Sequence, residues 1–184
     1  MVLNENDWEV IEGCQQGDPE AFAVLFEAHR DKVYSIALRF SGDPATALDI
    51  AQEVFVKLLA RIRDFRKGAR FETWLYRVVV NTCLDHHKRT RRLLPLLEEA
   101  LDAIRPGRET ALTDLLRLEA RDTVQKAVAG LSPEHRVVVV LRYTEELSYE
   151  EIAEVLNCSR GTVASRLNRA HKILERKLAR FRNG

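Results

Sequence analysis

The sequence lacks the features of disulfide-stabilised and membrane-spanning proteins. Its cysteines are three, an odd number, and lie far apart at Cys14, Cys83 and Cys158. A disulfide framework is therefore not expected, and a reducing compartment is. No apolar run has the length of a transmembrane helix, and the N-terminus lacks a signal-peptide pattern. We expect a cytoplasmic protein without direct membrane insertion.

Strand-like alternation is also missing, and glycine and proline fall at segment boundaries such as 17–19 and 41–44. The sequence therefore predicts an all-α fold. The expected helices cover residues 6–12, 20–40, 45–63, 71–92, 113–130, a segment capped by Ser132, 149–156 and a segment capped by Ser159. The valine-rich stretch 137–141 resembles a strand, but its place after a capped start favours a buried helix. We expect two helical domains, 1–92 and 113–184, joined by a flexible linker over 93–112.

The net charge of +1 does not by itself indicate a nucleic-acid-binding protein, but the distribution of charge does. From Ser159 onward only Glu175 opposes a series of cations: Arg160, Arg166, Arg169, Lys172, Arg176, Lys177, Arg180 and Arg182. The segment 61–92 also has many more cations than anions. Two basic patches in a balanced chain predict two contacts with a polyanion.

The pattern around residues 148–174 is typical of a helix-turn-helix. Ser148 and Glu151 have the spacing of a capping box, Asn157 suits a tight turn, and Ser159 can cap the next helix. On that helix Val163, Leu167, Ala170 and Leu174 share one face, while Ser165, Asn168, Arg169, Lys172 and Arg176 share the other. Such donors reach phosphates and base edges in a major groove. An ordinary helical hairpin with a solvated basic face is the alternative.

Two further polar groups lie in the first domain. Asp49, Gln52 and Glu53 cluster beside an apolar seam, an arrangement that by itself usually indicates only a solvated face. The basic loop 65–70 precedes a stripe made of Trp74, Arg77, Asn81 and Lys88. An aromatic ring beside cations suits single-stranded nucleic acid, because rings stack on unpaired bases. Trp74 could equally be a core residue.

These stretches together resemble the bacterial RNA polymerase sigma factors of the extracytoplasmic-function (ECF) branch of the sigma-70 superfamily. The resemblance rests on Asp49–Phe55 (DIAQEVF), Phe71–Val78 (FETWLYRV), Leu131–Arg136 (LSPEHR), Leu147–Ala153 (LSYEEIA) and Gly161–Leu167 (GTVASRL), in that order. It covers nearly the whole chain. It implies a region 2 domain that binds core polymerase and the −10 element, and a region 4 domain that binds the −35 element.

The resemblance also implies site residues and partners. Core polymerase would be bound through its clamp coiled coil and flap, with clamp contacts from Leu48, Asp49, Gln52, Glu53 and Phe55. The −10 element would meet Phe65, Arg66, Lys67, Arg70, Trp74, Arg77, Asn81 and Lys88. The −35 element would meet Arg160, Thr162, Ser165, Arg166, Asn168, Arg169 and Lys172. An anti-sigma factor is the further expected partner.

The chain departs from the family pattern at two positions of the last helix. Ala164 stands where the family usually has lysine or arginine, which removes a phosphate or base contact, and His171 replaces a frequent arginine. We expect no cofactor, and we disfavour zinc at Cys83, His86 and His87 because a fourth ligand is missing.

The predicted function is promoter selection and promoter melting by core polymerase, not enzymatic catalysis. The alternatives are a stand-alone helix-turn-helix regulator and a decoy that binds polymerase but not DNA.

Overall fold

The computed structural model describes residues 8–66, 68–101 and 123–182, and within these ranges it is helical without strands. The helices are α1 (Trp8–Gln16), α2 (Pro19–Ser41), α3 (Pro44–Arg61), the 3-10 turn η1 (Ile62–Asp64), α4 (Phe71–Leu101), an unlabelled helical segment at 123–129, α6 (Pro133–Tyr143), α7 (Tyr149–Leu156) and α8 (Arg160–Arg182). The predicted all-α fold is confirmed.

The helix breaks predicted before α2 and α3 are present, and each consists of an aspartate cap followed by a proline. The Asp18 carboxylate accepts a hydrogen bond from the Glu20 backbone N–H at 2.9 Å, and Asp43 accepts one from Thr46 at 2.8 Å. A proline occupies the first helical turn in both cases, where its missing N–H costs nothing. Gly42 ends α2 with φ of 78°, a conformation that favours glycine.

Helix α4 is longer than the sequence predicted. It was expected to end near Arg92 and instead continues to Leu101, into the segment expected to be linker. Leucine, glutamate and alanine flank Pro95 there, and these strong helix formers carry the helix across the single proline. The rest of the predicted linker, and the first part of the helix predicted at 113–130, lie outside the described residues.

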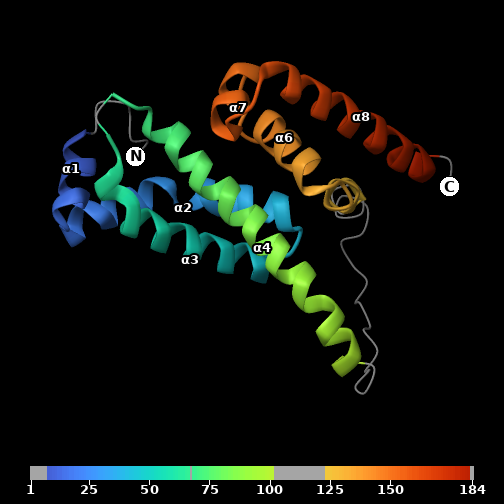
Figure 1. Cartoon of the computed structure of the whole chain (residues 1–184), viewed down its shortest axis with the longest axis horizontal. Helices are drawn as coiled ribbons and strands as arrows, with labels where there is room; N and C mark the ends of the chain where they lie inside the picture. Colours follow the sequence, from blue (N-terminus) through green and yellow to red (C-terminus); the bar gives the residue numbers. More distant parts are fainter. Residues whose placement is uncertain (1–7, 67, 102–122, 183–184) are drawn as a thin grey trace.

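The first helical group, α1 to α4, has a core that α2, α3 and α4 fill jointly. Its fully buried side chains include Leu25, Val33, Ile36, Ile50, Val54, Leu58, Leu75 and Val79. Each such burial stabilises the fold by about 1.5–3 kcal/mol before entropy is counted. The long helices of this group run beside one another, with α1 at one end (Figure 1).

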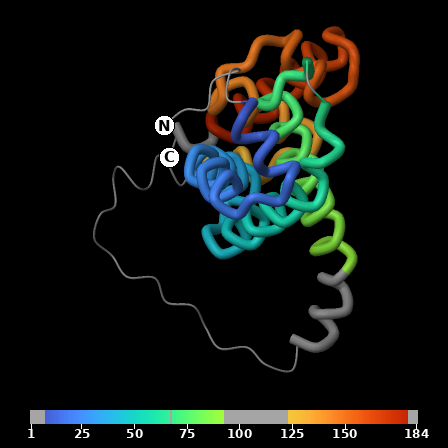
Figure 2. The backbone as a smooth tube through the Cα atoms, turned by 90° about the vertical axis from the view of Figure 1, so that its left-hand side faces the viewer, coloured from blue at the N-terminus to red at the C-terminus, as the bar shows by residue number. Residues whose placement is uncertain are grey.

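The second group contains the 123–129 segment and α6 to α8. The stretch Val137–Leu141, strand-like in sequence, forms a helix and is buried, as predicted. Ser132 stands at the cap position of α6, but its hydroxyl pairs with His135 Nδ1 at 2.9 Å and not with the backbone. The two groups lie against each other in both views, α7 against α4 and α6 against α2 (Figures 1 and 2).

Candidate functional site

The helix-turn-helix has the local geometry that the sequence predicted. The Ser148 hydroxyl accepts a hydrogen bond from the Glu151 N–H at 3.2 Å, and the Ser148 N–H donates to the Glu151 carboxylate at 2.8 Å. Asn157 ends α7 in the left-handed region with φ of 48°. The Ser159 hydroxyl accepts from the Thr162 N–H at 3.1 Å and so caps α8. Three local signals thus fix the angle between α7 and α8.

Helix α8 has one buried and one exposed face. Val163, Leu167 and Ala170 are buried. The exposed residues of the predicted −35 set are Arg160, Ser165, Asn168, Arg169 and Lys172, while Thr162 and Arg166 are half-buried. Arg160 pairs with Glu150 at 3.0 Å, and the Ser165 hydroxyl donates to the Thr162 carbonyl at 3.0 Å. The exposed face carries amide, hydroxyl and cationic donors, which suits a DNA groove.

A groove of about 700 Å³ runs between α2 and α3. Its α3 wall has unusually exposed apolar side chains, with Leu48 at 53%, Val56 at 67% and Leu59 at 52% exposure. Large contiguous apolar patches on a surface usually mark an interaction site. Val56 was not among the predicted site residues. The signal that would have found it was the apolar character of α3 around much of its circumference.

The predicted polymerase-binding residues do not all face this groove. Leu48 and Gln52 line it, and Asp49 is exposed on the same helix. Phe55 contributes to the floor but is buried, its ring centroid 4.6 Å from that of Phe26. Phe55 therefore supports the groove from below.

Glu53, another predicted polymerase-binding residue, contacts α4. It is half-buried, with Lys57 at 2.9 Å and a short contact from Arg89 of α4. Burial acts to raise the pKa of Glu53, but hydrogen bonds and charge from Lys57 and Arg89 outweigh it and lower the pKa. The carboxylate thus ties α3 to α4, whereas Leu48 and Gln52 face outward.

The basic loop before α4 is held by an aromatic cluster. Phe65 is buried at 6% exposure, and its ring centroid lies 5.3 Å from Trp74, 5.6 Å from Phe71 and 6.2 Å from Trp8. Phe65 was predicted to meet DNA, but in this structure it anchors the loop from inside. Trp74 packs on Phe65 and Phe71 yet stays half-exposed, so part of its ring surface remains accessible.

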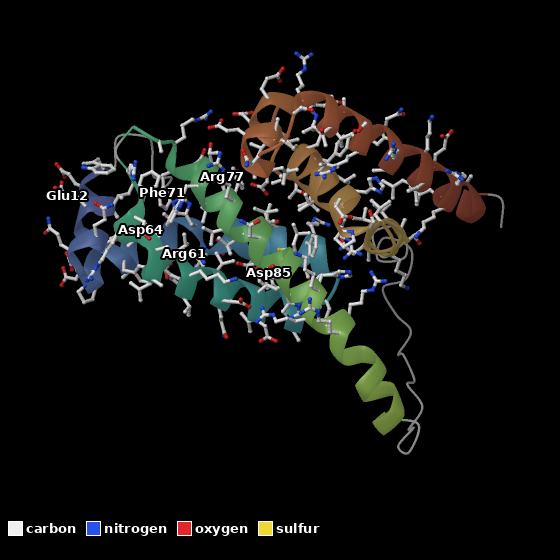
Figure 3. All side chains as sticks on the ribbon, viewed as in Figure 1. Glu12, Arg61, Asp64, Phe71, Arg77 and Asp85 are labelled. Atoms are coloured by element: carbon white, nitrogen blue, oxygen red, sulfur yellow. The ribbon has the colours of Figure 1, made fainter. Side chains whose placement is uncertain are left out.

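The remaining predicted −10 residues lie at the loop and along α4. Arg66 and Arg70 are exposed at the loop, and Asn81 and Lys88 are exposed on α4. Lys67 lies outside the described residues. Arg77 is half-buried and lies on the side of α4 that faces α7 (Figure 3), where its guanidinium donates to the Glu154 carbonyl at 2.8 and 3.2 Å. Arg77 therefore has a protein partner in this conformation.

Comparison with known families identifies both halves of the chain. Residues 25–93 match sigma-70 region 2, and residues 121–174 match sigma-70 region 4. The chain is 36% identical to the RNA polymerase sigma-H factor of Pseudomonas aeruginosa over 186 aligned positions, covering 97% of this chain and 96% of that one. It is 34% identical to the ECF sigma factor SigW of Bacillus subtilis, covering 91% and 94%.

Solved structures agree on the fold. CnrH in complex with the cytosolic domain of CnrY is 25% identical with a TM-score of 0.66, covering 92% of this chain and 95% of that one. The sigma factor RpoE of Bartonella quintana, in complex with the anti-sigma factor NepR, has a TM-score of 0.64 at 23% identity, covering 86% and 96%.

The chain therefore belongs to the sigma-70 family, whose members are transcription initiation factors of RNA polymerase. Within that family it is an ECF sigma factor. None of the described helices is long and apolar enough to cross a lipid bilayer.

Proposed function

We propose that this ECF sigma factor binds core RNA polymerase through the groove between α2 and α3. The observation that carries the proposal is the exposed apolar rim of Leu48, Val56 and Leu59, with the Asp49 carboxylate beside it. Apolar side chains supply affinity once they are desolvated, and an acidic neighbour favours a basic partner surface such as the clamp coiled coil. Glu53 and Phe55 act indirectly, by holding α3 in place.

DNA would be bound at two separate places. The loop 65–70 and the α4 stripe of Trp74, Arg77, Asn81 and Lys88 would take the unpaired −10 element, and the exposed face of α8 would take the −35 duplex. Stacking and phosphate contacts with the single strand would offset the few kcal/mol that unstacking a base costs. The chain would thus act in the cytoplasm as a specificity factor and not as an enzyme.

The division of the chain follows the same reasoning. We assign residues 1–92 to polymerase and −10 binding and residues 113–184 to −35 binding, with 93–112 between them. The separate region 2 and region 4 matches support this division. The extension of α4 to Leu101 means that the connection starts as helix.

An anti-sigma factor is the third proposed partner, and we place its binding at the α2–α3 groove. A protein that covered Leu48 and Val56 would exclude polymerase directly. The relatives of similar fold solved with bound partners, among them CnrH with CnrY, support this proposal.

The substitution Leu48→Asp tests polymerase binding. Leu48 is half exposed, so a carboxylate is tolerated in the free chain but would be buried without a partner in the complex. We expect at least about tenfold weaker binding to purified core polymerase, as for a central interface residue. The measurement is fluorescence anisotropy of the labelled chain.

Val24→Asp is the matched control. Val24 is a 40% exposed apolar residue of α2 that does not line the groove, so this variant should bind normally. An equal loss of polymerase binding in both variants, or a loss in neither, would contradict the placement of polymerase at the α2–α3 groove. Run-off transcription with the same proteins tests the two alternative functions. A stand-alone regulator or a decoy would not redirect initiation by core polymerase, so redirected initiation would exclude both.

A further inference from the structure

The short helix α1 lies against the base of the loop that precedes α4. It contacts α2 and the turn η1, at the end of the first helical group where Asp64 and Phe71 lie (Figure 3). The residues of α1 belong neither to the proposed DNA-binding surfaces nor to the α2–α3 groove. The helix is nevertheless bonded to the segment from which the proposed −10 loop starts.

Gln15 of α1 joins both ends of the turn that leads into this loop. Its Nε2 donates to the Ile62 carbonyl at 2.9 Å and to the Phe65 carbonyl at 2.7 Å. The side-chain NH₂ group has two N–H donors, so each carbonyl accepts one. These two acceptors also determine which way the amide points, because its own oxygen in that place would face two other oxygens. A side chain that only accepts hydrogen bonds cannot replace Gln15 here.

Phe65, the first residue of the loop, is fixed through its backbone and through its ring. Its N–H donates to the Ile62 carbonyl at 3.1 Å, and its carbonyl accepts from Gln15. Its ring packs against three aromatic residues, Trp8, Phe71 and Trp74. The following loop residues 66 and 68–70 are exposed. The position of the exposed part of the loop is therefore determined at its base.

Helix α1 can hold the base of the loop because α1 is itself closely packed on α2. Its residues Ile11 and Cys14 are buried in the core. A β-carbon built on Gly13 would lie only 2.7 Å from Cβ of Ala21, closer than two such carbons come in proteins. The two helices therefore approach each other as closely as a glycine permits. A continuous set of contacts leads from α2 through α1 to Phe65.

We propose that Gln15 is a positioning residue for promoter opening, whose two hydrogen bonds hold the loop 65–70 in the shape that accepts one unpaired base of the −10 strand. This proposal rests on the proposed function of the loop. A base taken out of the stack is recognised best by a pocket whose walls are in place before the base arrives. Gln15 contacts no DNA in this role. It acts through Phe65.

Loss of the two hydrogen bonds should reduce base discrimination at a single position of the strand. An oligonucleotide with the preferred base gains affinity from the loop, whereas one with another base there gains none. A loop that has the correct shape in only a fraction of the molecules therefore weakens binding of the first oligonucleotide and not of the second. A purely structural role of Gln15 would lower the unfolding temperature and leave this ratio of affinities unchanged.

Four variants separate the hydrogen bonds from the bulk of the side chain. Gln15→Met keeps the length of the side chain and removes both donors. Gln15→Glu has nearly the same shape as glutamine and replaces the donors by acceptors, so it is a second test that does not depend on how well the methionine packs. Gln15→Lys restores N–H donors, and its charge suits carbonyls at a helix end. Gln16→Met, at the exposed neighbouring position, is the matched control.

The probes are labelled single-stranded oligonucleotides whose sequence is selected from a random pool by the wild-type chain bound to core polymerase. Each position in turn carries each of the four bases, and fluorescence anisotropy gives the affinity of every variant in complex with core polymerase. We expect Gln15→Met and Gln15→Glu to lower discrimination at one position by roughly threefold to tenfold, as when the competent loop falls to between a third and a tenth of molecules. Gln15→Lys and Gln16→Met should keep the wild-type ratio.

Unchanged discrimination in both Gln15→Met and Gln15→Glu would overturn the role of Gln15. An equal loss at every position, or the same loss in Gln15→Lys or Gln16→Met, would overturn it as well, because the effect would then not come from the two donors. The variant Arg66→Ala/Arg70→Ala tests the proposed function separately. If that variant in complex with polymerase binds the selected strand as tightly as the wild type, the loop does not take the −10 strand and the proposed function of the loop is wrong.

Discussion

At the scale of single residues, the buried and half-buried polar groups show most clearly what holds the helices together. Arg136 is buried and Glu53 is half-buried, and each holds helices together through several partners, so these two charges serve structure. Burial raises the pKa of Cys83 to about 12, which keeps the thiol protonated and unsuited to metal binding at neutral pH. His29 is different, because it is buried at 2% exposure and neither ring nitrogen has a partner within the described part of the chain.

The burial of His29 predicts that the folded chain loses stability in mild acid. Burial, and then the charge of Lys32, lower its pKa from the ordinary value of 6.5, with Glu72 acting in the opposite direction. The unfolded chain therefore takes up the proton first, and the free energy of unfolding falls as the pH drops below about 6.5. His29→Leu should fill the space beside Phe71 and lose less stability between pH 7.5 and 5.5 than the wild type. Urea unfolding at both pH values measures this, and identical pH dependence in the two proteins would contradict it.

At the scale of elements, helix starts and turns are determined locally. Asp18, Asp43, Ser148 and Ser159 each satisfy backbone N–H groups within three residues of themselves. Ser132 has the same sequence signature, but its hydroxyl turns to His135. A comparison of Ser148 with Ser132 therefore distinguishes the effect of the capping hydrogen bond from the effect of a serine at the cap position.

Ser148→Ala should lower the free energy of unfolding by about 1 kcal/mol, because it removes the accepted bond from Glu151 and the alanine cannot replace it. Ser132→Ala should cost distinctly less, because its hydroxyl makes no such bond in the structure. Thermal unfolding of the full chain monitored by circular dichroism measures both. Equal losses of stability in the two variants would show that the hydrogen bond from the Glu151 N–H to Ser148 makes no contribution of its own.

The sequence predicted these local features and missed the ones that depend on a distant partner. The capping box, the turn at Asn157 and the two faces of α8 follow from spacing alone. Nothing near Glu53 in sequence indicates that Arg89 would neutralise it, and nothing near Phe65 indicates the contact with Trp8. The end of α4 was placed too early because Pro95 was weighted above the helix formers around it.

At the scale of the whole molecule, the two proposed DNA-binding surfaces differ in their surroundings. Arg77 of the α4 surface faces α7 (Figure 3), whereas Asn168, Arg169 and Lys172 of α8 are exposed. The proposed −35 surface of α8 can therefore be tested in the chain as it stands.

Arg166→Ala tests this surface. Arg166 lies on α8, and its loss should weaken binding to a duplex selected by the wild-type chain bound to core polymerase by roughly 1–3 kcal/mol if it contacts a base. Binding of the −10 single strand should be unchanged, because Arg166 lies on a different helix from the proposed −10 residues. A lower salt slope with unchanged sequence discrimination would make Arg166 a phosphate contact only. If Arg166→Ala left duplex binding unchanged, the assignment of this part of α8 to the −35 duplex would be wrong.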